Sequence, residues 1–222
     1  MNYCFCVLGW YFYEDFFESL FKLPGDKFVI SHRSQEWLDA AELPAGVRER
    51  LRVYENIGLD WGLYHQFKES TALSKYDFVI YIQDDVVIKD ASFIGRCAEL
   101  LSQPGIKVVG NGKNGTDWQF RFEKYRDRMF WQEPDDYIVR TVRGSFFAAR
   151  TDIFETIGNF PVYWKVTGGP KQNKANISLR NFGYLITKHF GADAITYLDW
   201  DHYLDTPYLN ELVRGERTPV TT

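Results

Sequence analysis

A run of β-branched and aromatic residues that ends in two adjacent carboxylates constrains this chain more than any other feature. Residues 78–82 (FVIYI) are apolar at every position, and Asp84 and Asp85 follow shortly after. An apolar run without alternation is typical of a strand buried on both faces, as in a parallel sheet covered by helices. Open α/β sheets bind ligands at the carboxyl ends of their strands. The segment therefore predicts a central strand with two hard oxygen ligands at its end, suited to Mg²⁺ or Mn²⁺.

The two aspartates also have a simpler interpretation, because Asp residues after a strand often cap a helix or close a turn. On the motif alone the two interpretations have about equal weight. The surrounding sequence favours the ligand-binding one, because the segments on either side of it are those of an α/β domain.

Strands and helices alternate through the first half of the chain. Tyr3–Leu8 and residues 28–32 are expected strands, and Glu14–Phe21 between them carries its apolar residues on one helical face. A strand, a helix and a strand joined by short links imply a parallel sheet with a right-handed crossover. Further helices are expected at about 58–74 and 92–102, and a further strand at 106–110. We therefore expect an α/β fold with a mostly parallel, doubly wound (Rossmann-like) sheet flanked by helices.

The second half is less regular. Strands are expected at 137–143 and 146–149, and helices at 152–157 and 176–190. The stretch 156–192 contains no acidic residue and carries several cations, which are Lys165, Lys171, Lys174, Arg180 and Lys188. A basic loop near a metal site could close over a diphosphate, and a solvated basic face is an equal alternative.

Composition excludes several classes of function. The chain has 222 residues and a formal net charge of −4, which argues against general nucleic-acid binding. No apolar run is long enough to span a bilayer, and Glu14 and Asp15 interrupt the apolar start, so we expect no signal peptide. Three cysteines without a spaced framework favour reduced thiols and a cytoplasmic location.

Other candidate ligand contacts end the first two strands or open the following helix. Carboxyl ends of neighbouring parallel strands share one edge of a sheet, and a helix N-terminus offers free N–H groups to a phosphate. The candidates are Gly9, Trp10, Tyr11, Ser31, His32, Asn56 and Gly58.

Taken together, these features resemble glycosyltransferases of the GT-A fold, which use nucleotide-diphosphate sugars. The resemblance spans about residues 3–202. Its anchors are the opening strand–helix–strand unit, Asn56-Ile57-Gly58, the strand closing on Gln83-Asp84-Asp85, and Arg143-Gly144-Ser145 through Gly158-Asn159-Phe160. It implies one GT-A domain over residues 1–222, with a nucleotide-sugar-binding half at about 1–110 and an acceptor-side half at about 111–222.

Gln83-Asp84-Asp85 is similar to the Asp-x-Asp motif of that family, with the first Asp replaced. The resemblance implies that Asp85 binds the metal and takes part in catalysis, that Asp84 contacts the donor, and that Gln83 is an uncharged group near the ribose. It also implies donor contacts from Arg143, Gly144 and Ser145. Many family members add a C-terminal His ligand, which corresponds here to His202, although a single His in such surroundings is usually structural.

The chain departs from the family after the Gly-Gly-Phe-like turn at 158–160. Inverting members usually carry a catalytic Asp or Glu shortly after this turn, whereas no carboxylate follows here until Asp193. Either the base comes from elsewhere, with Asp152, Asp199 and Asp201 as candidates, or the enzyme retains configuration and uses no such base. Retention is slightly favoured.

The expected function is metal-dependent transfer of a sugar from a nucleotide-diphosphate sugar, foremost a UDP-sugar, to a hydroxyl of a glycan or glycoconjugate. A sugar-phosphate nucleotidyltransferase is the alternative, but its Gly-rich basic loop is absent after the first strand, where Leu8-Gly9-Trp10-Tyr11 stands. A non-catalytic carbohydrate-binding module is disfavoured by the helices, because such modules are usually all-β. Chains of this type can also form one module of a larger assembly enzyme.

Overall fold

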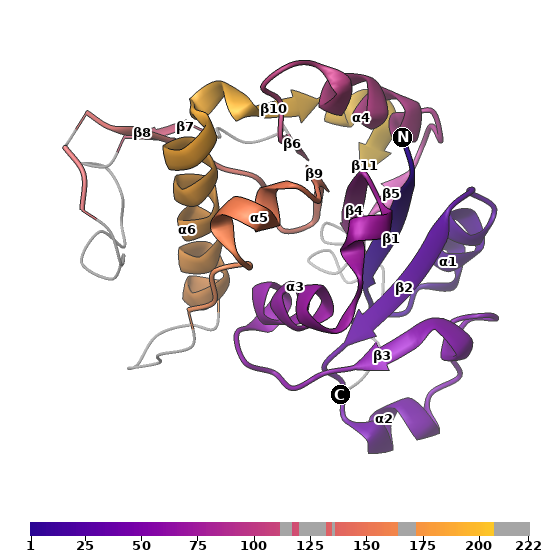
Figure 1. Ribbon diagram of the computed structural model, residues 1–222. Helices are drawn as coiled ribbons and strands as arrows, with labels where there is room; N and C mark the ends of the chain where they lie inside the picture. The colour runs from indigo at the N-terminus through magenta and orange to yellow at the C-terminus, as the bar shows by residue number, and fades with distance from the viewer. Residues whose placement is uncertain (112–116, 120–131, 135, 164–171, 207–222) are drawn as a thin grey trace.

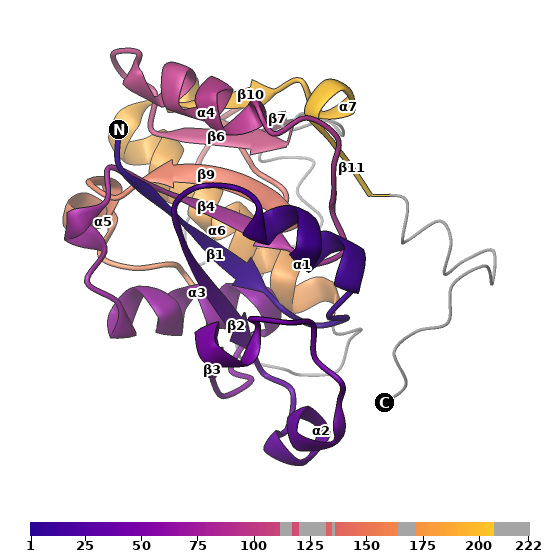
Figure 2. The same ribbon diagram turned by 90° about the vertical axis from the view of Figure 1, so that its right-hand side faces the viewer.

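Seven strands form the central sheet in the computed structural model of the chain, which describes residues 1–111, 117–119, 132–134, 136–163 and 172–206. Figure 2 shows the strands in spatial order from top to bottom. They are β10 (Ile195–Leu198), β6 (Val108–Asn111), β9 (Phe146–Arg150), β4 (Phe78–Gln83), β1 (Tyr3–Leu8), β2 (Asp26–Ser31) and β3 (Leu51–Val53). Neighbouring strands are parallel except at β9, which is antiparallel to β4 and to β6. The predicted, mostly parallel α/β sheet is therefore confirmed.

Helices cover both faces of this sheet, and α3, α5 and α6 lie together on one side of it (Figure 1). The helices are α1 (Glu14–Phe21), α2 (Gln35–Ala40), α3 (Leu59–Ser70), α4 (Phe93–Ser102), α5 (Ile153–Ile157), α6 (Gln172–Phe190) and α7 (Trp200–Tyr203). Two small antiparallel pairs complete the architecture. They join β5 (Val87–Ile88) to β11 (Leu204–Asp205) and β7 (Asp117–Gln119) to β8 (Ile138–Arg140).

The apolar run of β4 separates two cores. Phe78, Ile80 and Ile82 pack in a cluster with buried residues of α1 and α4, whereas Val79 and Tyr81 pack in a second cluster with buried residues of α3, α5 and α6. Successive side chains of a strand point to opposite faces, so an uninterrupted apolar run fits a strand covered on both sides. Most aromatic side chains of the described residues belong to these two cores.

Element boundaries agree closely with the sequence in the first half and less well in the second. The β1 and α1 boundaries are the predicted ones, but α3 ends at Ser70 and α6 begins at Gln172, four residues before the predicted start. Gly158 ends α5 as expected, with φ of 76° and its N–H donating to the Phe154 carbonyl at 3.0 Å. The basic loop expected before α6 lies mostly outside the described residues.

The strand order reverses at β1, because β2 lies on one side of it and β4 on the other. Ligands of open α/β sheets bind in the crevice at such a reversal, outside the carboxyl ends of the strands. Within the described part of the chain no helix combines the length and apolar character needed to cross a membrane. The cysteines Cys4, Cys6 and Cys97 are free and buried.

Candidate functional site

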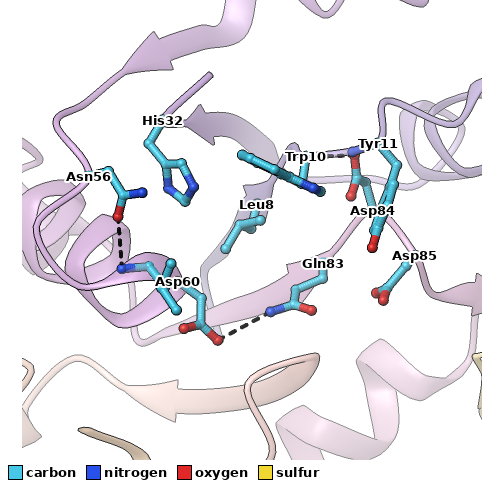
Figure 3. A pocket seen from close by; sticks show the side chains of 10 residues that line it. Leu8, Trp10, Tyr11, His32, Asn56, Asp60, Gln83, Asp84 and Asp85 are labelled. Atoms are coloured by element: carbon cyan, nitrogen blue, oxygen red, sulfur yellow. Dashed lines mark hydrogen bonds between the residues drawn. The ribbon is translucent and has the colours of Figure 1, made fainter. Parts of the chain in front are cut away.

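A pocket of about 420 Å³ opens where β1 and β4 end (Figure 3). This volume is in the range of small-molecule sites. It is lined by Leu8, Trp10, Tyr11, His32, Asn56, Leu59, Asp60, Gln83, Asp84 and Asp85. All but Leu8, Leu59 and Asp60 are among the candidates from the sequence. The strand reversal thus brings together side chains that follow β1, β2 and β4 and those that open α3.

Asp84 holds the loop after β1. Its side chain is 1% exposed, and one carboxylate oxygen, Oδ2, accepts hydrogen bonds from the backbone N–H groups of Trp10, Tyr11 and Phe12 at 2.9, 2.8 and 2.5 Å. The pKa of Asp84 is raised to about 7, chiefly by burial and also by the charge of neighbouring Asp85, although the three N–H groups lower it. Asp84 therefore orients the loop that brings Trp10 and Tyr11 to the pocket.

Strained backbone conformations occur in two segments beside the pocket, the loop after β1 and the start of α3. Phe12, at the end of the Asp84-bound loop, has φ of 55°, and Leu59, which opens α3, has φ of 60°. Left-handed φ values are uncommon outside glycine, and such residues gather at functional sites where their surroundings hold them. Asn56 helps to hold the conformation of Leu59, because its Oδ1 accepts the N–H of Leu59 at 3.1 Å.

Asp85 points toward the pocket beside Asp84 (Figure 3). Its Oδ1 is buried and has no hydrogen-bond partner within the described residues, and the same is true of Oδ1 of Asp84. Burial raises the pKa of Asp85 to about 6. Buried carboxylate oxygens without partners are costly in free energy, so they indicate a ligand that the protein alone does not supply.

Asp60 is a pocket carboxylate that the sequence did not reveal. It lies in the first turn of α3, where its Oδ1 accepts the N–H of Trp61 at 3.0 Å and its Oδ2 lies 3.4 Å from Nε2 of Gln83. Burial raises its pKa to about 6. An acidic residue in the first turn of a helix is usually explained by the helix dipole, so the local pattern gave no signal for a site.

An aromatic wall closes the pocket on the side of β1 and β2. The Trp10 ring lies 5.0 Å from the His32 ring, between centroids, and the Arg33 guanidinium carbon lies 3.6 Å from the centroid of a Trp10 ring. Arg33 also donates two hydrogen bonds to the Trp10 carbonyl, at 3.0 and 2.8 Å. The Arg33 guanidinium therefore fixes Trp10 both as a cation–π partner of its ring and as a hydrogen-bond donor to its carbonyl.

Gly9, Ser31 and Gly58, predicted to contact a nucleotide, do not line the pocket. A Cβ on Gly9 would lie 2.7 Å from the Phe12 ring, and one on Gly58 would lie 2.4 Å from Cγ1 of Val162, so packing requires both glycines. Ser31 is fully buried, with its carbonyl bonded to the N–H of Tyr54. The three residues are buried and lie behind the residues that line the pocket.

The turn Arg143-Gly144-Ser145 contacts two residues that line the pocket, Asp60 and Gln83. A Cβ on Gly144 would lie 2.6 Å from Oδ2 of Asp60, and the Ser145 carbonyl accepts the backbone N–H of Gln83 at 3.0 Å. Burial lowers the pKa of Arg143, as does the nearby charge of Arg180. None of the three lines the pocket, but Gly144 lies against Asp60 and Ser145 holds the backbone of Gln83.

Asp152 lies at the opposite edge of the sheet. Strand β9 is antiparallel to β4, with Phe146 across from Ile82 and Arg150 across from Phe78, so residues after β9 leave at the edge where β4 begins. There Asp152 forms ion pairs with Lys107 and Arg150, each at 2.9 Å. The proposal of Asp152 as the base is therefore wrong for this site, and its carboxylate is structural.

Asp199, Asp201 and His202 end β10 at the same edge as Asp85, but none of them lines the pocket. His202 Nε2 lies 3.6 Å from Oδ2 of Asp90, and Lys89 donates a hydrogen bond to the Asp201 carbonyl. Asp199 is exposed. The described residues contain no group of three or more His, Cys, Asp or Glu side chains able to hold a metal. The structure places the His202 imidazole beside Asp90, and not among the residues that line the pocket.

Comparisons with known proteins give structural neighbours only. No family model matches the sequence, and no curated protein matches it either. Solved structures with a similar fold include a mannosyltransferase of Pyrobaculum calidifontis in complex with GDP-Man and Mn²⁺, at 13% identity with a TM-score of 0.53. They also include S. aureus TarS with UDP, at 15% identity with a TM-score of 0.51. A third is glucosyl-3-phosphoglycerate synthase of Mycobacterium tuberculosis with Mn²⁺, UDP and glucosyl-3-phosphoglycerate, at 12% identity with a TM-score of 0.52.

The matches cover most of this chain and a smaller share of the neighbours. They span 89%, 92% and 88% of this chain, and 56%, 60% and 68% of the mannosyltransferase, TarS and the synthase respectively. At such low identity the likeness establishes architecture alone. The sheet order, the reversal at β1 and these neighbours agree with the architecture expected from the sequence: the chain has the GT-A fold of nucleotide-sugar glycosyltransferases.

Proposed function

We propose that this chain is a metal-dependent glycosyltransferase that moves a sugar from a nucleotide-diphosphate sugar, foremost a UDP-sugar, to a hydroxyl of a glycan or glycoconjugate. The observation that carries the proposal is the position of Asp85, whose buried Oδ1 has no partner within the described residues and which lines the pocket at the strand reversal. Neighbours of the same fold were solved with UDP, GDP-Man and Mn²⁺, which supports this class of donor.

The residues at this position suit Mn²⁺ or Mg²⁺. Both ions prefer oxygen ligands, and Mg²⁺ is usually held by one or two carboxylates together with substrate phosphates and water. Asp85 would hold the ion, and no closed set of protein ligands is required. When bound, the ion neutralises the charge that develops on the leaving diphosphate.

The protein's own groups position the donor. Asp84 orders the backbone that carries Trp10 and Tyr11, and His32 faces the Trp10 ring on the same side of the pocket. Leu59 and Asp60, in the first turn of α3, also line the pocket, and the side chains of Asn56 and Asp60 accept the N–H groups of Leu59 and Trp61 there. In the transfer itself the acceptor oxygen bonds to the anomeric carbon as the bond from that carbon to the diphosphate breaks.

We favour retention of configuration. No carboxylate occurs in the sequence between Gly158 and Asp193, and Asp152 lies at the other edge of the sheet, so neither of the positions nearest the turn at 158–160 supplies the base that inverting members use. Without such a base, the departing diphosphate oxygen takes the proton of the acceptor hydroxyl. Proton NMR of the new anomeric centre would decide the stereochemistry once an acceptor is known.

Calorimetric titration of UDP, with Mn²⁺ and then with EDTA, tests the proposal on the wild type and on Asp85→Asn. We expect Mn²⁺-dependent binding that weakens at least about 100-fold in the variant, because the ion contributes several kcal/mol through its carboxylate ligand. Asp199→Asn is the matched control at the end of β10 and should bind as the wild type does. Unchanged binding in Asp85→Asn would contradict the metal assignment, and no binding of UDP or GDP by the wild type would contradict the proposed function.

The two alternatives from the sequence are less well supported. A carbohydrate-binding module of the usual all-β kind does not fit an α/β sheet covered by helices. A nucleotidyltransferase would hold its triphosphate with a basic Gly-rich loop after β1, whereas residues 9–13 there contain no Lys or Arg. Release of pyrophosphate from UTP and a sugar 1-phosphate would favour that alternative.

A further inference from the structure

Asp60 brings a carboxylate close to the end of β4, where Gln83 carries an uncharged amide. Gln83 is the last residue of β4, and Figure 3 shows its amide nitrogen turned toward Asp60 and its amide oxygen turned the other way. The nitrogen lies 3.4 Å from Oδ2 of Asp60. An amide and a carboxylate from two different elements thus form one polar pair inside the pocket.

Three segments hold this pair in place. A Cβ on Gly144 would lie 2.6 Å from Oδ2 of Asp60, so the turn before β9 lies directly against the carboxylate. The same turn accepts the Gln83 backbone N–H at Ser145, and its Gly144 carbonyl accepts the hydroxyl of Tyr64 from α3 at 3.0 Å. The carboxylate is therefore pre-oriented rather than free to turn into solvent.

Asp60 has no cation as a partner. Within the described residues it forms no ion pair, and its protein contacts are the N–H groups of its own turn and the amide of Gln83. A partly buried carboxylate without a counter-charge is expensive to keep unless a ligand completes its hydrogen bonds. In the described part of the chain each carboxylate oxygen has one protein partner, and the pocket side is open for further contacts from a donor.

From this arrangement we propose that Asp60 supplies the carboxylate that Gln83 lacks, and that the two side chains together bind adjacent hydroxyl groups of the donor. The inference rests on the proposed function. Hydroxyls suit the pair because both Asp60 and the Gln83 amide oxygen accept hydrogen bonds, and O–H donors bring no charge that needs a closed ligand set. The hydroxyls belong either to the ribose or to the transferred sugar.

An exchange of the two groups tests the proposal. Asp60→Asn and Gln83→Glu are isosteric, and together they move the carboxylate from α3 to the end of β4 while keeping one amide and one carboxylate. Binding is measured with Mn²⁺ for UDP, 2′,3′-dideoxy-UDP and UDP-glucose. We expect Asp60→Asn to weaken binding of the hydroxyl-bearing ligand about 10- to 100-fold, and the exchange to restore it to within about threefold of the wild type.

The ligands identify the source of the hydroxyls. A loss seen with UDP and absent with 2′,3′-dideoxy-UDP supports binding of the ribose. A loss seen only with UDP-glucose, at unchanged UDP affinity, supports binding of the transferred sugar. Thermal melting of each variant checks the fold. Gly144→Ala displaces the Asp60 carboxylate without removing its charge, and it should weaken binding of the same ligand. Gly95→Ala in α4 is its control.

Two results would overturn the inference while the proposed function stands. In one, Asp60→Asn binds all three ligands as the wild type does, although Asp85→Asn has lost Mn²⁺-dependent binding. In the other, Asp60→Asn loses affinity and the exchange fails to restore it, which would show that the carboxylate acts only from α3. Failure of the wild type to bind UDP would overturn the proposed function first, and the inference with it.

Discussion

Strands β4 and β10 end at the same edge of the sheet with similar residues, yet their ends have different surroundings. Gln83-Asp84-Asp85 follows the apolar run of β4, and Asp199-Trp200-Asp201-His202 follows β10. Asp84 is 1% exposed and accepts three backbone N–H groups, whereas Asp199 is exposed and the side chain of His202 is 59% exposed. Two acidic strand ends thus give one buried, preorganised site and one solvent-facing helix.

Strand order explains the difference. β4 lies beside β1, and the loop after β1 folds over Asp84 with its N–H groups. β10 lies at the edge of the sheet, with β6 and β9 between it and β4, which corresponds to about 14 Å at about 4.8 Å between strands. A carboxylate at a strand end becomes part of a site when the neighbouring strand supplies a loop to enclose it.

The largest expected difference between the two strand ends is in stability. Asp84→Ala leaves the N–H groups of Trp10, Tyr11 and Phe12 without their acceptor and should lower the free energy of unfolding by about 3 kcal/mol. Asp199→Ala, at an exposed position, should change it by less than about 0.5 kcal/mol. Urea denaturation measures both. Equal effects would mean that the three hydrogen bonds do not hold the loop.

A pH-dependent effect is expected at Asp60. Its pKa is raised from 3.8 to about 6, so the folded state binds an extra proton between these values and its contribution to stability is lost as pH rises through 6. Asp60→Asn removes that loss. The variant should match the wild type near pH 4 and exceed it by up to about 3 kcal/mol at pH 7.5, since one pKa unit is worth about 1.4 kcal/mol.

Urea denaturation between pH 4 and pH 7.5 checks this prediction, with Asp199→Asn as the exposed control. The control should follow the wild type at every pH. Asp84 and Asp85 have raised pKa values in the same range, so stability of Asp60→Asn will still depend on pH, though less steeply. A variant less stable than the wild type at pH 7.5 would show that Asp60 stabilises the fold through contacts that outweigh its burial.

The fold could be predicted because its signals are local. The apolar run of β4, the one-faced helix Glu14–Phe21 and the short links around it each follow from side-chain periodicity within about ten residues. The reversal at β1 and the antiparallel insertion of β9 do not, because strand order depends on which helix covers which face. For that reason Asp152 remained a candidate base in the sequence, although it lies at the opposite edge of the sheet.

Trp10, His32 and Asp85 line the pocket, and each was predicted from its place within two residues of the end of a strand. Residues predicted beside them do not line it where another segment decides exposure: Ser31 is fully buried, with its carbonyl bonded to the N–H of Tyr54, and Gly58 packs against Val162. Asp60 escaped prediction for the opposite reason. Its place in the pocket comes from contact with Gln83 and Gly144, which lie 23 and 84 positions away in the chain.

The smallest expected effect is at His202. The pairing of β11 with β5 puts Leu204 across from Ile88 and Asp205 across from Val87, so His202 lies beyond the far end of β5, beside Asp90. An exposed pair of this kind contributes less than about 1 kcal/mol. His202→Ala should therefore leave Mn²⁺-dependent UDP affinity within about twofold of the wild type, in contrast to the loss expected for Asp85→Asn.

Titration of UDP with Mn²⁺ and with EDTA measures this directly, and Asp90→Asn is the matched control, because it breaks the same pair from the other side. If only His202→Ala loses the Mn²⁺ dependence, the imidazole reaches the ion and the end of β10 belongs to the site after all. The segment from α7 to β11 would then have to move toward Asp85 when the donor binds. If neither variant loses it, the metal site is built from the end of β4, and the donor's phosphates supply what His202 does not.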